Sequence, residues 1–206
     1  MTPTLILPGL NGSGDGHWQQ FWLKDNSDSQ LVEQDDWQAP RIETWTKRLE
    51  EVLVREGPAY IVAHSLGCLL AANFADSPFA TLIRGALLVA PCDLAVTEDF
   101  HPGAIHFGRM PAAALPFPTI TVGSLNDIYM PLEGLSLYGR LWRSKILNLG
   151  NAGHININSG FGRWTGGYGL LSTLRKRAEP DRRAKDRVPE IERASTGSTA
   201  PEAERR

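Results

Sequence analysis

The sequence predicts an α/β fold, a mainly parallel six-stranded sheet with helices on both faces. Short apolar runs alternate along the chain with segments of helical periodicity. The apolar runs are almost continuous rather than alternating with polar residues, which is typical of parallel strands buried on both faces. The 206 residues suffice for one domain with a large core. We expect that domain to span residues 1–179.

The first half of the chain contains three expected strands, and each is followed by a helical pattern. The first strand, 4–7, runs into a loop with four glycines between Pro8 and Gly16. In the helix that follows, Trp18, Phe21 and Trp22 form a core-facing stripe. A helix opening at Pro40 repeats apolar residues every three or four positions and stops before Gly57-Pro58. The strands expected here are 4–7, 30–34 and 59–63, and the helices are 17–24, 40–56 and 66–75.

The second half repeats the alternation with longer connections. Strands are expected at 82–90, 119–123 and 145–149, with helices at 131–142 and 169–178. The proline-rich segment 92–116 is expected to be irregular and longer than a typical connector. From Pro180 to Arg206, 13 of 27 residues are charged and none is aromatic, so we expect a disordered charged tail.

Charge and cysteine content limit the class of protein. The net charge is −2, with 21 basic and 23 acidic residues, which favours neither a nucleic-acid nor a membrane partner. The sequence shows no signal-peptide pattern and no apolar run of about 20 residues, so the expected location is cytoplasmic. Cys68 and Cys92 lie in apolar surroundings and lack metal-ligand spacing. We expect buried thiols rather than a disulfide.

Ser65 stands where an apolar strand pattern changes to an alanine-rich helical pattern. The small residues Ala63 and Gly67 lie two positions before and after it. This spacing is typical of a nucleophile elbow, in which a tight turn exposes the serine hydroxyl above the sheet edge. The usual pattern has glycine at the position of Ala63. A serine at such a junction alternatively caps the helix, because its hydroxyl accepts a hydrogen bond from a free amide.

Asp127 and His154 follow the fifth and sixth expected strands. Since the carboxyl ends of parallel strands meet at one sheet edge, Ser65, Asp127 and His154 are expected to form a catalytic triad. His154 would act as the base, and Asp127 would orient its imidazole. Alternatively, Asp127 is a turn residue and His154 a surface residue. Asp93, after the fourth strand, is the second candidate for the acid.

An oxyanion hole requires backbone donors beside Ser65. The amide of Leu66, at the start of the next helix, is expected to be one donor. The second is expected from Leu10 or Asn11 in the glycine-rich loop, which lacks the phosphate-binding frame of glycines. His64 is expected to pack on the side opposite the nucleophile.

Several phrases resemble one known family. They are Leu7-Pro8-Gly9-Leu10-Asn11-Gly12-Ser13, Gly16-His17-Trp18, Val32 to Trp37, Ala63 to Cys68, Asn126-Asp127 with Tyr129, Gly150 to Asn156, and Ser159 to Gly162. These are similar to the small retinoblastoma-binding-protein-9-like, or YdeN-like, serine hydrolases. The resemblance extends to about Leu174. It implies an α/β-hydrolase fold without a large cap domain and the triad of Ser65, Asp127 and His154.

The predicted function is therefore a serine hydrolase that cleaves a small ester, thioester, amide or short-peptide bond through an acyl-enzyme on Ser65. No cofactor or metal is expected, and His101 and His106 are interpreted as loop histidines. Two alternatives remain: an interaction protein on a hydrolase scaffold, and an acyltransferase with the same triad. Five aromatic residues either line a pocket or fill the core, and the core is the default for each: Trp18, Trp37, Phe107, Phe161 and Trp164. Phe161 and Trp164 have the stronger case for the pocket rim, since both follow His154 in a glycine-rich loop.

Overall fold

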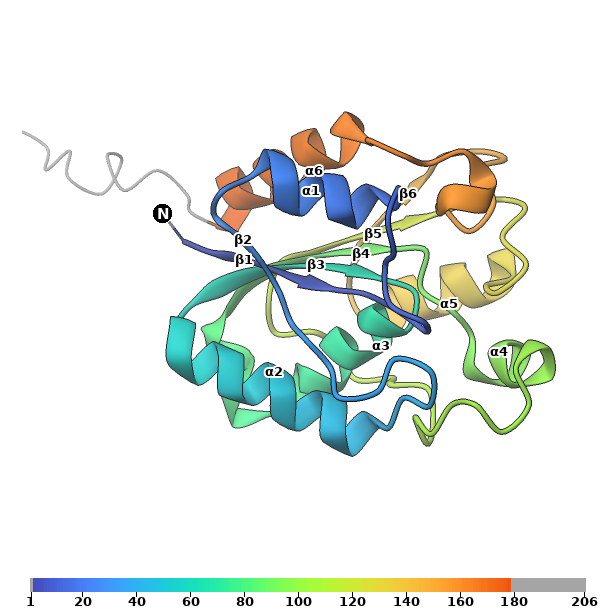
Figure 1. Cartoon of the computed structure of the whole chain (residues 1–206), viewed down its shortest axis with the longest axis horizontal. Coiled ribbons are helices and arrows are strands. Elements are labelled where there is room, and N and C mark those ends of the chain that lie inside the picture. Colours follow the sequence, from blue (N-terminus) through green and yellow to red (C-terminus); the bar gives the residue numbers. More distant parts are fainter. Residues whose placement is uncertain (1, 179–206) are drawn as a thin grey trace, which may run out of the picture.

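A computed structural model describes residues 2–178 of the chain. Its centre is one sheet of six parallel strands in the order β2-β1-β3-β4-β5-β6 (Figure 1). The strands are β1 (Thr4–Leu7), β2 (Ser29–Leu31), β3 (Ala59–His64), β4 (Ile83–Val89), β5 (Thr119–Gly123) and β6 (Lys145–Asn148). The predicted α/β fold is confirmed, and the sheet is parallel throughout.

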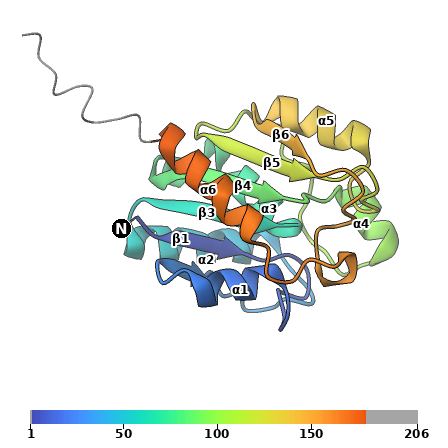
Figure 2. The same cartoon turned by 90° about the horizontal axis from the view of Figure 1, so that it is seen from above.

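Helices cover both faces of this sheet. Helices α1 (Trp18–Asp25) and α6 (Thr165–Ala178) lie on one face (Figures 1 and 2). Helices α2 (Ile42–Glu56), α3 (Leu66–Asn73) and α5 (Leu132–Leu141) lie on the other. Short 3-10 turns occupy Phe74–Asp76, Pro78–Leu82 and Ile157–Ser159.

The central strands are buried on both faces because their side chains alternate between two cores. In β3, Ile61 packs into the core beneath α2 and α3, whereas Tyr60 and Val62 pack into the core beneath α1 and α6. In β4, Leu88 and Leu87 divide in the same way. Side chains that alternate with period two fill both cores, which explains why these strands read as continuous apolar runs.

The segment 92–116 was expected to be irregular, but part of it is regular. Leu94–Phe100 forms a further helix, α4. Asp93 begins it, because its Oδ1 accepts hydrogen bonds from the amides of Ala95 and Val96 at 2.9 and 3.2 Å. This capping role also removes Asp93 as the alternative acid.

Two element boundaries differ by more than two residues from the expected ones. The second strand ends at Leu31 rather than residue 34. The last helix begins at Thr165 rather than Gly169. Glycines in its first turn obscure the helical pattern, but Gly167 has a packing reason: a Cβ there would lie 2.9 Å from the Trp22 ring. The predicted tail, 180–206, lies outside the described residues.

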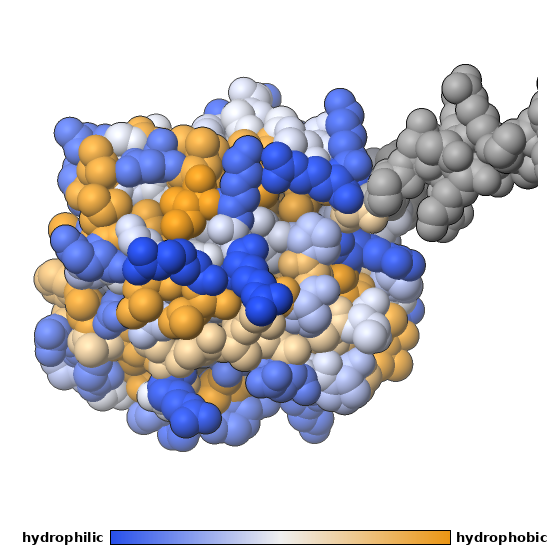
Figure 3. Space-filling view, turned by 180° about the vertical axis from the view of Figure 1, so that it is seen from behind, coloured by the Kyte–Doolittle hydropathy of each residue, from blue (hydrophilic) through white to orange (hydrophobic). Residues whose placement is uncertain are grey.

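The β6 side of the molecule is a free sheet edge in the described part of the chain. Hydrophobic groups there are interspersed with hydrophilic ones (Figure 3). Leu137 and Leu141 of α5 and Ile146 of β6 are among the exposed apolar side chains. Within residues 2–178, every helix is too short or too polar to cross a bilayer.

Candidate active site

Ser65 lies between β3 and α3 in a strained backbone conformation, with φ 53° and ψ −123°. A non-glycine residue rarely adopts positive φ, and such strain concentrates at functional sites. The Ser65 side chain makes no capping hydrogen bond to α3, so the alternative that it is a helix cap is wrong. The hydroxyl is therefore available above the sheet edge.

Two glycines allow the first loop to approach this serine. A Cβ on Gly67 would overlap the Leu7 carbonyl oxygen and lie 2.6 Å from that of Pro8. A Cβ on Gly9 would lie 2.7 Å from the Cβ of Ser65. Real Cβ atoms do not come this close to other atoms, so the contact between elbow and loop depends on glycine at both positions. Ala63 fits without exposure at the position where the elbow pattern usually has glycine.

Ser65, His154 and Asp127 are linked by hydrogen bonds. His154 Nε2 lies 3.0 Å from Ser65 Oγ, and His154 Nδ1 lies 2.9 Å from Asp127 Oδ2 and 3.0 Å from Oδ1. An ionised carboxylate only accepts, so Nδ1 carries the proton and the neutral ring accepts from the serine hydroxyl at Nε2. Asp127 and His154 are each 8% exposed, so the surface interpretation of His154 does not hold. Asp127 is a turn residue, since its Oδ1 accepts from the Tyr129 amide at 2.9 Å, and the same carboxylate also binds His154.

The loops that carry Asp127 and His154 are tied together by two polar side chains. Ser124 Oγ accepts from the amide of Ala152 at 2.9 Å and lies 3.1 Å from the Gly150 oxygen. Asn126 Oδ1 accepts from the amide of Gly153 at 2.7 Å. These bonds fix the loop after β5 against the loop after β6, and thereby the spacing between the acid and the histidine.

The backbone at His154 is held from below by β3 and α1. His64 Nε2 donates to the His154 carbonyl at 2.9 Å, and Trp18 Nε1 donates to the Ile155 carbonyl at 2.9 Å. His64 was expected to pack on the side opposite the nucleophile, but it lines the same cavity as Ser65 and binds the loop that carries His154. The sequence pattern gave no sign of this contact, because the two histidines are 90 positions apart.

His64 and His17 form a buried imidazole pair beside His154, with ring centroids 4.9 Å apart. Burial, and then the nearby His154, lower the pKa of His17 from 6.5 to about 4. The pKa of His64 is also lowered well below its usual value, first by burial and then by the neighbouring histidines. Both rings are neutral at pH 7.

Gln19 ties the glycine-rich loop to the sheet. Its buried side-chain amide donates to the carbonyls of Leu7 and Val62 at 3.2 and 3.3 Å. Its Oε1 accepts from Ser13 Oγ at 2.5 Å. One side chain of α1 therefore bridges the carboxyl ends of β1 and β3 and anchors the loop beside Ser65.

Hydrogen bonds of the same loop distinguish between the two amides predicted as oxyanion-hole donors. The amide of Asn11 donates to the Trp37 carbonyl at 2.7 Å, so it is engaged elsewhere. The position of a Cβ on Gly9 lies 3.2 Å from the Leu66 nitrogen, which places the start of α3 beside the loop. Of the two predicted loop donors, Leu10 is the one whose amide is compatible with an oxyanion hole beside Leu66.

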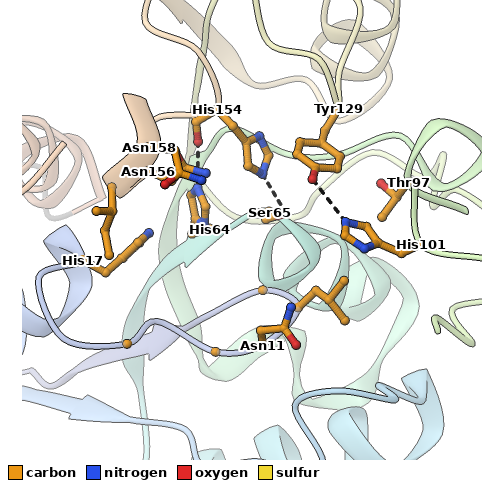
Figure 4. Close-up of a pocket in the computed structure, with 15 residues that line it drawn as sticks. Asn11, His17, His64, Ser65, Thr97, His101, Tyr129, His154, Asn156 and Asn158 are labelled. Atoms are coloured by element: carbon orange, nitrogen blue, oxygen red, sulfur yellow. Dashed lines mark hydrogen bonds between the residues drawn. The ribbon is translucent and has the colours of Figure 1, made fainter. Parts of the chain in front are cut away.

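A cavity of about 240 Å³ opens above Ser65 (Figure 4). One wall is the loop from Gly9 to Gly14, and another contains Asn156, Ile157 and Asn158. The third wall, formed by Thr97, His101 and Tyr129, was not predicted. Asn126 and Tyr129 belong to the phrases that resemble the known family. The sequence gave no sign, however, that α4 would pack beside them and complete this wall.

Phe161 and Trp164 pack against the core, which was the default for each, and the alternative that they form the pocket rim is wrong. Neither Phe161 nor Trp164 lines the cavity. Trp164 packs instead against Trp18, with ring centroids 5.6 Å apart, and Phe161 packs against Trp164 at 5.8 Å. The glycine-rich loop turns these rings back onto α1 rather than towards Ser65.

The two cysteines are buried free thiols, as predicted. Burial raises the pKa of the Cys92 thiol to about 11, so it stays protonated at neutral pH. The pKa of Cys68 is raised as well, chiefly by burial, and its thiol donates to the Val89 carbonyl at 3.4 Å. Neither is a thiolate nucleophile.

Residues 4–173 match the family model described as serine hydrolase. The chain belongs to the serine hydrolase family. This match includes every residue of the Ser65, Asp127 and His154 arrangement. The hydrolase has no match among curated protein sequences.

Solved structures with the same fold include several hydrolases. A putative YdeN-like hydrolase from Pectobacterium atrosepticum is 29% identical with a TM-score of 0.76, over 87% of this chain and 94% of that one. The ydeN gene product of Bacillus subtilis is 18% identical with a TM-score of 0.66, over 84% and 98%. A thermophilic esterase from Thermogutta terrifontis is 12% identical with a TM-score of 0.62, over 86% and 90%. The last two show the α/β-hydrolase fold alone.

Proposed function

We propose that this serine hydrolase cleaves a small ester, thioester, amide or short-peptide bond through an acyl-enzyme on Ser65. The observation that carries the proposal is the hydrogen-bonded series from Ser65 Oγ through His154 to Asp127, at 3.0 and 2.9 Å. A serine hydroxyl is a weak nucleophile, and a neighbouring base held in one orientation is what activates it.

In the proposed reaction, His154 Nε2 takes the proton from Ser65 as its oxygen attacks the scissile carbonyl. The resulting imidazolium is stabilised by the Asp127 carboxylate, which also holds Nδ1–H in place. His154 then protonates the leaving group as the tetrahedral intermediate collapses. A water molecule, activated by the same imidazole, releases the acyl group from Ser65.

The negative oxygen of the tetrahedral intermediate would accept hydrogen bonds from the amides of Leu66 and Leu10. Leu66 begins α3, so the positive end of the helix dipole adds to the stabilisation. Removing one donor of this kind typically lowers kcat by about 10²- to 10³-fold.

The size of the cavity supports a small substrate. Pockets for drug-sized ligands span roughly 300–1,000 Å³, whereas this cavity has about 240 Å³. Among the described residues that line it, Leu10 and Ile157 alone have large aliphatic side chains. Both features favour short acyl and leaving groups over long lipid chains.

The activity is tested with p-nitrophenyl butanoate. The wild type should turn over the ester, and Ser65→Ala should lower kcat by about 10⁶-fold, as when a serine nucleophile is removed elsewhere. Adding alcohols or amines and analysing the products distinguishes hydrolysis from acyl transfer. A folded wild type with no turnover of any short aryl ester would contradict the proposal.

Within the family we place the chain beside the YdeN-like hydrolases, supported by the 29% identity to the Pectobacterium protein. The retinoblastoma-binding-protein-9-like part of the resemblance stays a prediction. So do the cytoplasmic location and the expectation that neither nucleic acid nor a membrane is a partner.

A further inference from the structure

His101 and Tyr129 form a polar pair in the cavity that the proposed chemistry does not use. His101 Nε2 lies 3.1 Å from the Tyr129 hydroxyl, and the two rings are stacked with centroids 5.9 Å apart. Both side chains line the cavity beside Ser65 (Figure 4). They come from different elements, since His101 ends α4 and Tyr129 follows the acid.

Tyr129 is held firmly relative to the triad. Its amide donates to Asp127 Oδ1 at 2.9 Å, and its carbonyl accepts from the Asp93 amide at 2.8 Å. Its ring lies against His154, with centroids 4.6 Å apart. The phenol is thus fixed at the side of the reacting atoms, and a substrate group that meets it would be held in a defined place.

The pair has hydrogen-bonding capacity left over. A hydroxyl group donates once and accepts twice, and a neutral imidazole donates from one nitrogen only. When His101 Nε2–H donates to the phenolic oxygen, the Tyr129 O–H is free to donate into the cavity. Burial, and then the nearby Asp127, raise the pKa of Tyr129, so the phenol keeps this proton at neutral pH.

The charge of the cavity indicates which acceptor fits. No lysine or arginine is among the described residues that line it. A substrate carboxylate would therefore lack a cationic partner and lie near Asp127. A neutral carbonyl oxygen needs only one donor and costs far less to remove from water.

We propose that Tyr129, supported by His101, is a specificity residue that donates a hydrogen bond to a second, neutral carbonyl oxygen of the substrate. This inference rests on the proposed hydrolase function and narrows its substrates to short esters or amides that carry another carbonyl group near the scissile bond. His101 is a positioning residue in this account, because it fixes the direction of the phenolic hydrogen.

The test compares esters that differ by one carbonyl group. In the first pair, p-nitrophenyl 4-oxopentanoate is compared with p-nitrophenyl pentanoate, which places the carbonyl in the acyl chain. In the second, 4-oxopentyl butanoate is compared with pentyl butanoate, which places it in the alcohol. Each kcat/KM is divided by the rate of alkaline hydrolysis, so that intrinsic reactivity cancels.

The wild type should prefer the oxo compound by about tenfold in at least one pair, the effect of one hydrogen bond between neutral groups. Tyr129→Phe keeps the ring and should reduce that preference to about one, mainly through KM. His101→Asn should reduce it partly. Tyr138→Phe and His106→Asn, which change residues outside the cavity, should keep the wild-type preference.

Two results would overturn the inference. One is a wild type that turns over the two esters without an oxo group as fast as their oxo partners in both pairs. The other is a preference that survives in Tyr129→Phe. Both leave the hydrolase function intact, because turnover of the alkyl esters still depends on Ser65. A folded enzyme that hydrolyses none of the four esters, or whose turnover of them is unchanged by Ser65→Ala, contradicts the proposed function itself.

Discussion

Two walls of the cavity are built in different ways. Ser65, Asp127 and His154 come shortly after β3, β5 and β6, so the parallel sheet itself brings them together. The neighbouring wall contains Thr97 and His101, which belong to a seven-residue helix and its end between irregular segments. Sheet topology therefore brings the first three residues together, whereas the placement of one short helix forms the wall to which we assign substrate recognition.

The largest difference in kcat is expected between substitutions of two aspartates, one that binds His154 and one that begins α4. Asp127→Asn should lower kcat by about 10⁴-fold, because an amide cannot stabilise the His154 imidazolium or hold its tautomer. Asp93→Asn should change kcat by less than about threefold, since asparagine caps a helix as well as aspartate does. Steady-state kinetics on p-nitrophenyl butanoate checks both. A larger loss in Asp93→Asn than in Asp127→Asn would mean that the acid is misassigned.

A smaller effect on kcat is expected from the hydrogen bonds between the loop after β5 and the loop after β6. Ser124→Ala removes the side-chain acceptor of the Ala152 amide, which keeps its bond to the Gly150 carbonyl at 3.0 Å, and should loosen the contact between the two loops. A displacement of about 1 Å costs about 10²-fold in rate, so kcat should fall by tenfold to a hundredfold. Ser172→Ala, at an exposed position of α6, is the matched control and should leave kcat unchanged. Equal rates for both variants would show that Ser124 does not position the loop.

The smallest effect concerns stability rather than rate. Because the pKa of His17 is about 4 in the folded chain and ordinarily 6.5, the unfolded chain binds more protons between these values. The stability from this group is complete above pH 6.5 and is lost as the pH falls towards 4. Between pH 7 and pH 5 the loss should be about 2 kcal/mol, or several degrees in Tm.

His17→Asn separates this contribution, because asparagine keeps a side-chain acceptor for the Gln19 amide without titrating. Its Tm should fall less between pH 7 and pH 5 than that of the wild type, as measured by thermal unfolding. His106→Asn, at an exposed loop position, should retain the wild-type slope. An equal fall in Tm between pH 7 and pH 5 for His17→Asn and the wild type would contradict the lowered pKa of His17.

The sequence was sufficient to predict the parallel sheet and the three residues that meet at its edge. Buried strands and the turn at Ser65 are local patterns, and the positions of Asp127 and His154 follow once the strands are known. The glycine-rich loop does lie beside Ser65. That it supplies an oxyanion donor stays a proposal, and the preference for Leu10 over Asn11 depends on the bond from the Asn11 amide to Trp37.

Other features depended on contacts between distant segments. The N-cap at Asp93 was the one local signal for α4, and prolines on both sides concealed it. The pair of His101 and Tyr129 spans 28 positions and forms only when α4 packs beside the loop after β5. The sequence left the core and the pocket rim open for Trp164, because a loop rich in glycine carries no signal for the direction in which it turns.

The measurement that tests the central claim most directly is mapping of a fluorophosphonate adduct by mass spectrometry. These reagents phosphonylate a serine only when it is activated as a nucleophile. The account predicts a single adduct on the peptide that contains Ser65, slow labelling in His154→Ala, and none in Ser65→Ala. A folded wild type that remains unlabelled, or that carries its adduct on another serine, would contradict the account.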